Sequence, residues 1–514
     1  MTIDDVLSDL ESRRLDLGPR DRPVRAIFDT TYERALDDRR RDRFAALGAF
    51  APGGLTLAAV AAAWGVDPAT ASRDLRALTE LSLVDEPGRA VFELQPLVRD
   101  YAVSKFDALA PEVRLAVHGR VAEHFRQWLR AYEETNQEQT LCWYRFEQPD
   151  WQESKARYLF HLSRLEDRVA ARLAYTGLFF DAFWWWGSYV RFEYGDRLLV
   201  EWARDRCEDA EDRRWYKAMT GFARAYPLGP DKRGRGDWPV ALRCLLDARA
   251  LAGLDDSGAG VDAEDRRHVR AITAQFVGQC HRYLDRFDDA AASYRESLDL
   301  LEQGGEWWEV AWGRYAWADL ELDRGRLDEA EAQWRGALAI DLEHPRRELD
   351  VELRANLYRI EADVEWERGA PAAAFGRYAA ATFYAYRLQS SAHPPDIYAL
   401  TLYREMKRRV AARLGQLVSS GRGEEADAGL AAVARFWEPF WRAAGAEPPV
   451  APAAASVADR LGEVVDALLA PEPSERKLTS GNTRYRRQFA REAETLTAAM
   501  AADLDREAWP AAGA

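Results

Sequence analysis

Residues Ala290–Ser297 read AAASYRES, Ala330–Ala337 read AEAQWRGA, and Ala374–Ala381 read AFGRYAAA. Each stretch places a small residue, an aromatic residue and a second small residue at offsets 0, +4 and +7, which is one face of an α-helix. The three stretches begin 40 and 44 residues apart, and a fainter copy begins at Ala241. A repeat of this length predicts stacked helical hairpins, an architecture that usually binds other molecules.

An earlier helix is expected before each of the three stretches. These first helices cover Arg267–Tyr283, Trp307–Leu322 and Leu349–Glu367. Gly325 and Gly369 follow two of them, in turns where a left-handed backbone ends a helix. We expect the small residues to let paired helices approach closely, and the aromatic residues to fill the gap to the neighbouring hairpin.

This pattern resembles the tetratricopeptide repeat. That family has a small residue near the end of the first helix, glycine in the turn, and alanine, an aromatic residue and alanine on the second helix. The matching residues are Gly278, Ala290, Tyr294 and Ser297, then Ala318, Gly325, Ala330, Trp334 and Ala337, then Ala362, Gly369, Ala374, Tyr378 and Ala381. The units are longer than the family's standard repeat, and Asp285 stands where the first turn glycine is expected, so the repeats are degenerate. The resemblance covers residues 267–390 and extends more weakly over 215–440.

The composition indicates a globular protein with several domains. The chain has 514 residues, of which 47% are hydrophobic and 31% charged. Its formal net charge of −15 argues against a main role in coating nucleic acid or an anionic membrane. The four cysteines are scattered without a CxxC pair, as expected for free thiols in a reducing compartment. Neither a signal peptide nor a membrane span is apparent, so we expect a cytoplasmic protein.

Residues 38–106 follow a different pattern. Three helices are expected, followed by two strand-like runs joined by a tight turn. The helices cover Arg41–Phe50, Leu57–Trp64 and residues 69–80, and the strands cover Leu81–Asp85 and Ala90–Leu94. Three helices and a hairpin predict a winged helix-turn-helix.

Two roles compete for this module. In the first, the third helix enters the major groove of DNA through Ser72, Arg73 and Arg76, with Arg89 on the wing. In the second, the module is a structural spacer. The spacer is favoured because Asp74 and Glu80 offset the two arginines of the helix, whereas a DNA reader normally has a stronger basic footprint.

The order of the parts resembles the winged-helix region and superhelical sensor of STAND-type signal-transduction NTPases, the NB-ARC and bacterial regulator group. Phe44–Phe50 before the helix-turn-helix and Leu94–Ala102 after the wing carry the resemblance. The family often has a histidine in the second segment, where this chain has Gln95. The resemblance spans most of residues 20–390. It implies a module between an ATPase core and a sensor, with a bacterial regulatory or antiviral defence role.

No catalytic motif is found in the chain. A GxxxxGK[ST] phosphate loop is missing, so we expect either a stand-alone arm or the split partner of a separately encoded NTPase. HExxH and GxSxG are missing too, and we expect no enzyme activity, no metal and no cofactor. The aromatic run Phe179–Trp186 would make a helix apolar on almost every side. A buried core is favoured for it over an exposed ligand platform.

The first helices of the repeats should line the concave face of the stack. By the register of the family, nine positions would face a bound partner. They are Gln275, Gln279 and Arg282, then Trp312, Tyr315 and Asp319, then Asn356, Arg359 and Asp363. Amides, arginines and aromatic residues suit recognition of a protein or peptide. The alternative is that they are ordinary solvated residues.

The sequence thus predicts an all-α fold, with a winged helix-turn-helix followed by a right-handed superhelix of degenerate tetratricopeptide-like hairpins. We expect a non-enzymatic adaptor or sensor that binds a protein or peptide and couples to a partner, such as a separate NTPase subunit, through the winged helix. The alternative is a DNA-binding transcriptional regulator whose repeats sense a ligand; nucleic acid is the less favoured partner, and a membrane is not expected. The expected parts are a helical lead-in (1–37), the winged helix (38–106), a helical linker with aromatic-rich hairpins (107–235), the repeats (236–395), capping helices (396–442), an alanine- and proline-rich linker (443–456) and C-terminal helices (457–514).

Overall fold

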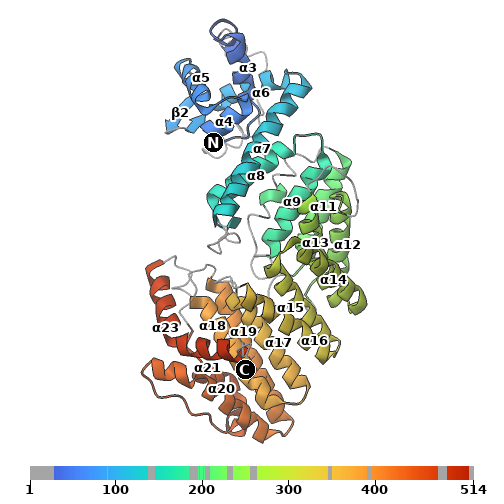
Figure 1. The fold of residues 1–514 in the computed structure, drawn as a ribbon, viewed down its shortest axis with the longest axis vertical. Helices are drawn as coiled ribbons and strands as arrows, with labels where there is room; N and C mark the ends of the chain where they lie inside the picture. The colour runs from blue at the N-terminus through green and yellow to red at the C-terminus, as the bar shows by residue number, and fades with distance from the viewer. Residues whose placement is uncertain are drawn as a thin grey trace, which may run out of the picture. The chain divides into compact units, whose positions relative to one another are not determined.

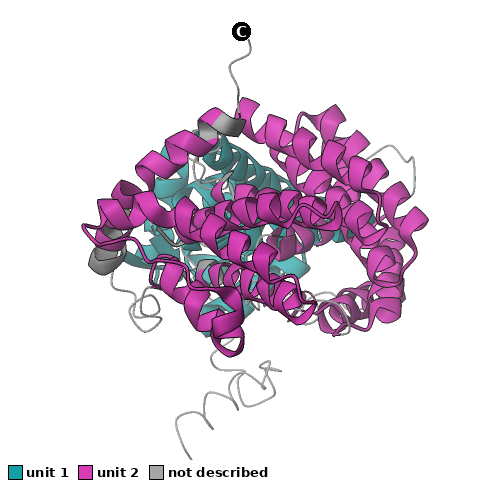
Figure 2. Cartoon of the chain, turned by 90° about the horizontal axis from the view of Figure 1, so that it is seen from below, with its two compact units in different colours: residues 1–175 teal, residues 176–514 magenta. Residues whose placement is uncertain are grey.

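The structure is a computed structural model, and its described part is predominantly helical (Figure 1). It describes residues 28–508, except for 30, 89–90, 137–144, 147, 185–194, 196, 201, 203–208, 228–234, 255–262, 345–349, 391–395 and 473–482. The chain divides into two compact units, unit 1 at residues 1–175 and unit 2 at residues 176–514 (Figure 2). Within the described residues, every helix is too short or too polar to span a lipid bilayer.

Unit 1 begins with three helices and a small sheet. The helices are α3 (Asp38–Leu47), α4 (Leu57–Trp64) and α5 (Pro68–Glu80), and the strands are β1 (Leu55–Thr56), β2 (Asp85–Gly88) and β3 (Val91–Glu93). The strands form an antiparallel sheet in the order β1-β3-β2. The expected helices at 57–64 and 69–80 are therefore present, and the short β1 was missed.

The hairpin differs in register from the expectation. Pairing begins only at Asp85 and runs through residues expected to form the turn, as far as Gly88. The preceding apolar residues Leu83 and Val84 are buried in the core of the module and do not pair as a strand. Leu83 and Val84 are therefore hydrophobic because they are buried after the end of α5. A short apolar run of this kind looks the same in the sequence whether or not it pairs as a β-strand.

Polar caps and a glycine fix the ends of α4 and α5. Asp67 caps α5 by accepting a hydrogen bond from the Thr70 amide at 2.9 Å, and Pro68 occupies the first turn. Gly65 ends α4 with φ +65°, a left-handed conformation that glycine adopts without steric cost. This short glycine–aspartate connection sets the angle between the two helices.

Four further helices follow. They are α6 (Pro96–Asp107), α7 (Pro111–Asn136), α8 (Pro149–Leu162) and α9 (Arg168–Ala182), the last of which crosses the boundary between the units. The long helix α7 packs against both α4 and α8. Between α7 and α8, the buried rings of His118 and His161 meet with their Nδ1 atoms 2.9 Å apart.

Unit 2 consists of helices that pack as consecutive antiparallel pairs (Figure 1). The pairs are α11 (Ala210–Ala225) with α12 (Trp238–Leu251), α13 (Ala263–Tyr283) with α14 (Phe287–Gly304), α15 (Trp307–Asp323) with α16 (Leu327–Glu343), α17 (Asp350–Glu367) with α18 (Pro371–Ser390), and α19 (Asp396–Ser419) with α20 (Gly423–Ala443). Neighbouring pairs also contact one another, as α14 does α15 and α16 does α17. This succession of pairs is the solenoid that the repeat predicts.

The turns inside these pairs share one backbone conformation. Gly325 and Gly369 have φ +70° and +79°, as expected from the sequence. Asp285, at the matching position after α13, has φ +57°. Aspartate is among the few non-glycine residues that tolerate this region, because its short polar side chain can bond locally. The chain thus keeps the same turn without the glycine.

The aromatic run after Thr176 forms part of the core of unit 2. Phe179, Phe180 and Phe183 are buried. Phe179 stacks on Phe183, all three pack edge-on against Phe222, and Phe180 and Phe183 lie tilted against Phe276. This arrangement agrees with the expected buried core for those residues. Trp185 and Trp186 of the same run lie outside the described residues.

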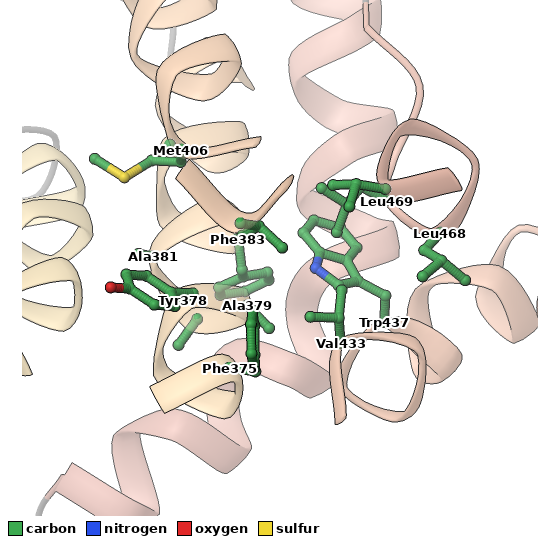
Figure 3. Close-up of a cluster of buried hydrophobic side chains, with 14 of the residues drawn as sticks. Phe375, Tyr378, Ala379, Ala381, Phe383, Met406, Val433, Trp437, Leu468 and Leu469 are labelled. Carbon is green, nitrogen blue, oxygen red and sulfur yellow. The ribbon is translucent and has the colours of Figure 1, made fainter. Parts of the chain in front are cut away.

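The C-terminal helices complete the core around α18. A 3₁₀ helix (Ala454–Arg460), α21 (Leu461–Leu468) and α23 (Thr483–Ala508) follow α20. Figure 3 shows the Trp437 indole of α20 beside Phe383 of α18, with Leu468 and Leu469 close by. The C-terminal helices therefore share one hydrophobic core with the last helix pairs.

The alanine- and proline-rich segment lies against this core. Within residues 447–453, only Glu447, Val450 and Ala453 are exposed, and Val450 is 90% exposed. Exposure at every third residue is the pattern of a polyproline II helix with one edge toward solvent. The amide of Ala454 donates to Asp427 Oδ1 at 2.6 Å and anchors the end of the segment to α20. Of the segment expected to be a linker (443–456), residues 448–454 therefore pack partly against unit 2, whereas residues 443–447 are exposed.

Candidate functional site

Ionic side chains from four successive first helices meet along unit 2. We call this set the charge ladder: Arg282 of α13, Asp319 and Asp323 of α15, Arg359 and Asp363 of α17, and Arg409 and Arg413 of α19. Because each residue lies toward the C-terminal end or middle of its helix, the stacking of the pairs aligns them. Four of the nine residues predicted to bind a partner belong to the ladder.

Asp319 joins the first three helices of the ladder. Its two carboxylate oxygens accept hydrogen bonds from Arg282 Nη1 at 2.6 Å and from Arg359 Nη2 at 3.0 Å. Arg282 also donates through Nε to Asp323 at 2.6 Å. One carboxylate on α15 thus connects α13 with α17.

Asp363 joins α17 with the helices that follow. Its carboxylate accepts hydrogen bonds from Arg359 Nη1 at 3.1 Å, Arg409 Nη1 at 3.1 Å and Arg413 Nη2 at 3.3 Å. The Tyr378 hydroxyl of α18 donates to the same carboxylate. Three guanidinium groups therefore share this single buried acid.

Two further predicted residues line the ladder. The Tyr315 hydroxyl accepts a hydrogen bond from Arg359 Nη2 at 3.2 Å and donates to Asn356 Oδ1 at 3.4 Å. The Arg359 guanidinium also lies 5.7 Å from the centre of the Tyr315 ring, within range of a cation–π interaction. Tyr315 thus shares Arg359 Nη2 with Asp319, and Asn356 accepts a hydrogen bond from the Tyr315 hydroxyl.

Burial and pairing act in opposite directions on the charges of the ladder. Burial disfavours the ionised carboxylate of Asp319, but Arg282 and Arg359 outweigh it and hold the pKa of Asp319 well below its usual range. In the same way, burial opposes the charge of Arg359, whereas Asp319 raises the pKa of Arg359 well above its ordinary value. The central pairs are therefore fully charged at neutral pH.

The ladder is closed at its centre and more open at α19. The side chains of Arg359 and Asp363 are each 8% exposed, whereas Arg413 is 20% and Arg409 33% exposed. Nearby, burial raises the pKa of Glu405, also on α19, although Arg359 and Arg409 lower it. Solvent, and any partner, therefore reaches the ladder most easily at Arg409, and next at Asp323, which is 24% exposed.

The other three predicted residues lie outside the ladder. Gln275 is fully buried against Gly313, and its amide has no hydrogen-bond partner among the described residues. Gln279 accepts a hydrogen bond from the Tyr226 hydroxyl. Trp312 is partly buried against Trp308 and Tyr315. A partner on the surface could not reach Gln275, because α15 covers its side chain. The repeat register places Gln275 on the first helix but carries no information about how closely α15 approaches.

Three ladder residues were missed from the sequence: Asp323, Arg409 and Arg413. Arg409 and Arg413 are four residues apart and so lie on one face of α19, which carries five basic residues between Arg404 and Arg413. That spacing was a usable signal. The sequence prediction did not include Arg409 and Arg413, because residues 396–442 lack the small–aromatic–small register of the repeats.

The predicted DNA-binding residues of unit 1 lie mostly on the open side of α5. Arg73 and Arg76 are exposed, their side chains make no ion pair or hydrogen bond with any described residue, and Ser72 is half-buried. Arg89 lies outside the described residues. Asp74, expected to offset the arginines, is instead only 1% exposed and binds Arg43 of α3, with Arg39 and Arg40 each 3.8 Å away. Its charge is therefore neutralised within the module and does not offset the outer face of α5.

No group of three or more histidine, cysteine, aspartate or glutamate side chains that could hold a metal ion occurs in the described part of the chain. The ladder itself consists of ion pairs, to which the phenols of Tyr315 and Tyr378 are hydrogen-bonded. Such groups can bind and orient a charged or polar partner.

Comparison with known proteins gives a single distant similarity. No family model matches the chain. No curated protein matches it either. Among solved structures, it is similar to a STAND signal-transduction ATPase with a tetratricopeptide repeat sensor from Pyrococcus horikoshii, with a TM-score of 0.34 and 14% sequence identity. The similarity covers 94% of this chain and 67% of that one.

Proposed function

We propose that the chain is a non-enzymatic adaptor or sensor that binds a protein or peptide on the first helices of unit 2. The charge ladder is the observation that carries this proposal. Buried ion pairs are costly to desolvate and contribute little net stability compared with apolar packing. A line of them across four helices is therefore better explained by recognition and specificity than by stability alone.

The rest of unit 2 supports a binding role. The helix pairs keep the small–aromatic–small register of tetratricopeptide-like repeats, with Ala290, Ala330 and Ala374 fully buried. Stacks of this kind present extended surfaces formed by successive first helices. The ladder residues occupy those helices, where a bound segment would cross several repeats.

We propose that the first module of unit 1 is a winged helix that couples this recognition to a partner. A separately encoded NTPase is the partner class that fits a sensor arm without a phosphate loop. The three-stranded sheet and capped helices of the module support its assignment as a winged helix. This assignment makes unit 1 the output and unit 2 the input of the protein.

A pull-down from the native host, with and without nuclease, tests the proposal. The bait is the full chain, compared with Arg359→Gln/Asp363→Asn, which removes one charge of each sign from the ladder. Arg422→Gln/Glu425→Gln is the matched control, because that pair is exposed and lies on α20. We expect one protein to be recovered in stoichiometric amount with and without nuclease. Its recovery should be lost with the ladder variant and kept with the control variant. Equal recovery by both variants would exclude the ladder as the recognition surface.

One observation favours a second function, DNA binding by unit 1. Arg73 and Arg76 are free of ion pairs on the exposed face of α5, and Asp74 is turned inward. This removes part of the charge argument against a DNA reader. The test is binding of a labelled duplex at increasing salt by the full chain and by Arg73→Ala/Arg76→Ala. A DNA-binding protein would lose affinity steeply with salt, and the variant would show a shallower slope.

A further inference from the structure

The open end of the charge ladder carries more basic than acidic groups at its surface. Arg409 and Arg413 are the most exposed arginines of the ladder, and both bind Asp363, which is nearly inaccessible. Arg359 binds the same carboxylate from within. The positive groups therefore face outward, and the acid that balances them lies beneath.

The donors of Arg409 are only partly used. Within the described residues, Arg409 donates only through Nη1, to Asp363, so Nε and Nη2 remain available. Arg413 donates to Asp363, to the Tyr378 hydroxyl and to Gln416. One edge of the Arg409 guanidinium is thus free, beside a second guanidinium whose orientation is fixed.

The remaining charges around this end fall into two groups. On α19, Arg404 pairs with Glu472, and Lys407 pairs with both Glu472 and Asp466. Arg408 is exposed and makes no ion pair with any described residue. The acids that approach the patch are Glu405 of α19 and Glu367 of α17, the latter 3.9 Å from Arg413. The exposed surface therefore presents Arg408, Arg409 and Arg413, with acids at its margin.

We infer that Arg409 and Arg413 bind the carboxylate side chains of an acidic peptide segment in the protein partner. The inference rests on the proposed function and specifies the chemistry of that partner. A guanidinium fork matches a carboxylate through two parallel hydrogen bonds, and two forks one helical turn apart accept carboxylates at a similar spacing. Asp363 serves as the internal counter-ion that keeps the two arginines oriented while the site is empty of partner.

An acidic peptide fits this surface better than a nucleic acid does. A continuous phosphate backbone would pass from Arg413 to Glu367 and, along the ladder, to Asp323, both of which would repel it. The net charge of −15 adds a long-range repulsion that grows with the number of charges on the partner. A short run of carboxylates can bind the arginines and end before these acids.

Fluorescence anisotropy with the full chain tests the inference. The probes are a labelled peptide of alternating glutamate and serine, the same peptide with glutamine in place of glutamate, and a single-stranded oligonucleotide of similar length. We expect the glutamate peptide to bind at least about tenfold more tightly than the glutamine peptide, with the difference shrinking at high salt. Arg409→Gln/Arg413→Gln should remove the difference.

Arg422→Gln/Arg435→Gln is the matched control, because it also removes two positive charges, one at the N-cap of α20 and one on that helix. Circular dichroism of each variant is measured to check that the fold is retained. Three results would each overturn the inference. The two peptides could bind equally, the control variant could lose the difference in affinity as fully as Arg409→Gln/Arg413→Gln, or the oligonucleotide could bind more tightly through the same arginines. If the peptides bind equally while a protein partner still depends on the ladder, only the acidic preference is wrong and the proposed function stands.

Discussion

Tyr294 of α14 lies directly against the backbone of Gly278 on α13. A β-carbon at residue 278 would lie 2.5 Å from Cε1 of the tyrosine ring, closer than real β-carbons approach any atom. Tyr294 is fully buried, so its ring has little room to move away. The glycine therefore sets the distance between the two helices of this pair.

Gly278→Ala should destabilise unit 2 by about 1–3 kcal/mol, because the added methyl group overpacks a filled interface. Gly376→Ala is the control in the same unit, since a β-carbon there meets no atom within 4 Å. That control should be stabilising by about 0.5–1 kcal/mol, through the better helix propensity of alanine. Urea unfolding followed by circular dichroism measures both. Equal effects of the two changes would show that the Tyr294 contact does not limit the spacing.

Asp319→Asn should lower the unfolding free energy by about 1–3 kcal/mol, because Arg282 and Arg359 would lose their shared buried counter-ion. Both arginines keep a second carboxylate, Asp323 and Asp363, so the loss should stay below that of an isolated buried pair. Asp328→Asn is the control, because that carboxylate pairs with Arg368 but is 93% exposed. Its effect should stay within about 0.5 kcal/mol in the same urea experiment. If Asp328→Asn lowered the unfolding free energy as much as Asp319→Asn does, the buried ion pairs of the ladder would be no more important for stability than an exposed pair.

The buried histidine pair of unit 1 should make that unit sensitive to acid. Burial lowers the pKa of His161 well below its ordinary value, and His118, Arg164 and Arg157 lower it further. The folded state therefore stays neutral where the unfolded chain binds a proton. The resulting stability is present above about pH 6.5 and is lost as the pH falls toward the folded pKa.

His161→Gln should flatten this dependence between about pH 7 and 5, seen as hydrogen exchange of the α7 and α8 amides. His344→Gln, a change at an exposed histidine of unit 2, should leave it unchanged. An identical acid response in wild type and His161→Gln would assign the sensitivity to other groups.

His268 in unit 2 should respond to pH in the opposite direction. Burial alone would lower its pKa, but Asp181, whose Oδ1 lies 2.9 Å from Nε2, and Glu306 raise it well above the ordinary value. The stabilising contribution is complete below about pH 6.5 and is lost as the pH rises through the folded pKa. His268→Gln should therefore cost most stability at about pH 6 and progressively less in alkaline buffer. Thermal unfolding at several pH values measures this, and a cost that does not change with pH would show that the imidazole is neutral in the fold.

Most of the fold that could be predicted from the sequence follows from residues at regular helical spacing. Small and aromatic residues at helical spacing identified the helix pairs, because their burial depends mainly on neighbours within the same hairpin. Gly325 and Gly369 marked turns for a local steric reason that sequence alone reveals. The spacing of these signals predicted the helical solenoid, which the structure confirms in its described part.

The environment of the charged residues could not be predicted in the same way. Asp74 looked like an exposed acid among arginines, but α3 supplies Arg43 to bury it. Arg359 and Asp363 looked like open binding residues, yet partners from α15 and α19 enclose them. In each case the deciding partner lies about 30 or more residues away, and charge patterning carries no signal for such pairs.

The shared carboxylates of the charge ladder also bear on mechanics. Asp319 holds arginines from the helices before and after its own, and Asp363 holds arginines from its own helix and the next. Any bending that separates neighbouring repeats must stretch these bonds and admit ions to them. The ladder should therefore stiffen unit 2 against bending, and because its central pairs are buried, the surrounding salt should weaken that resistance only slightly.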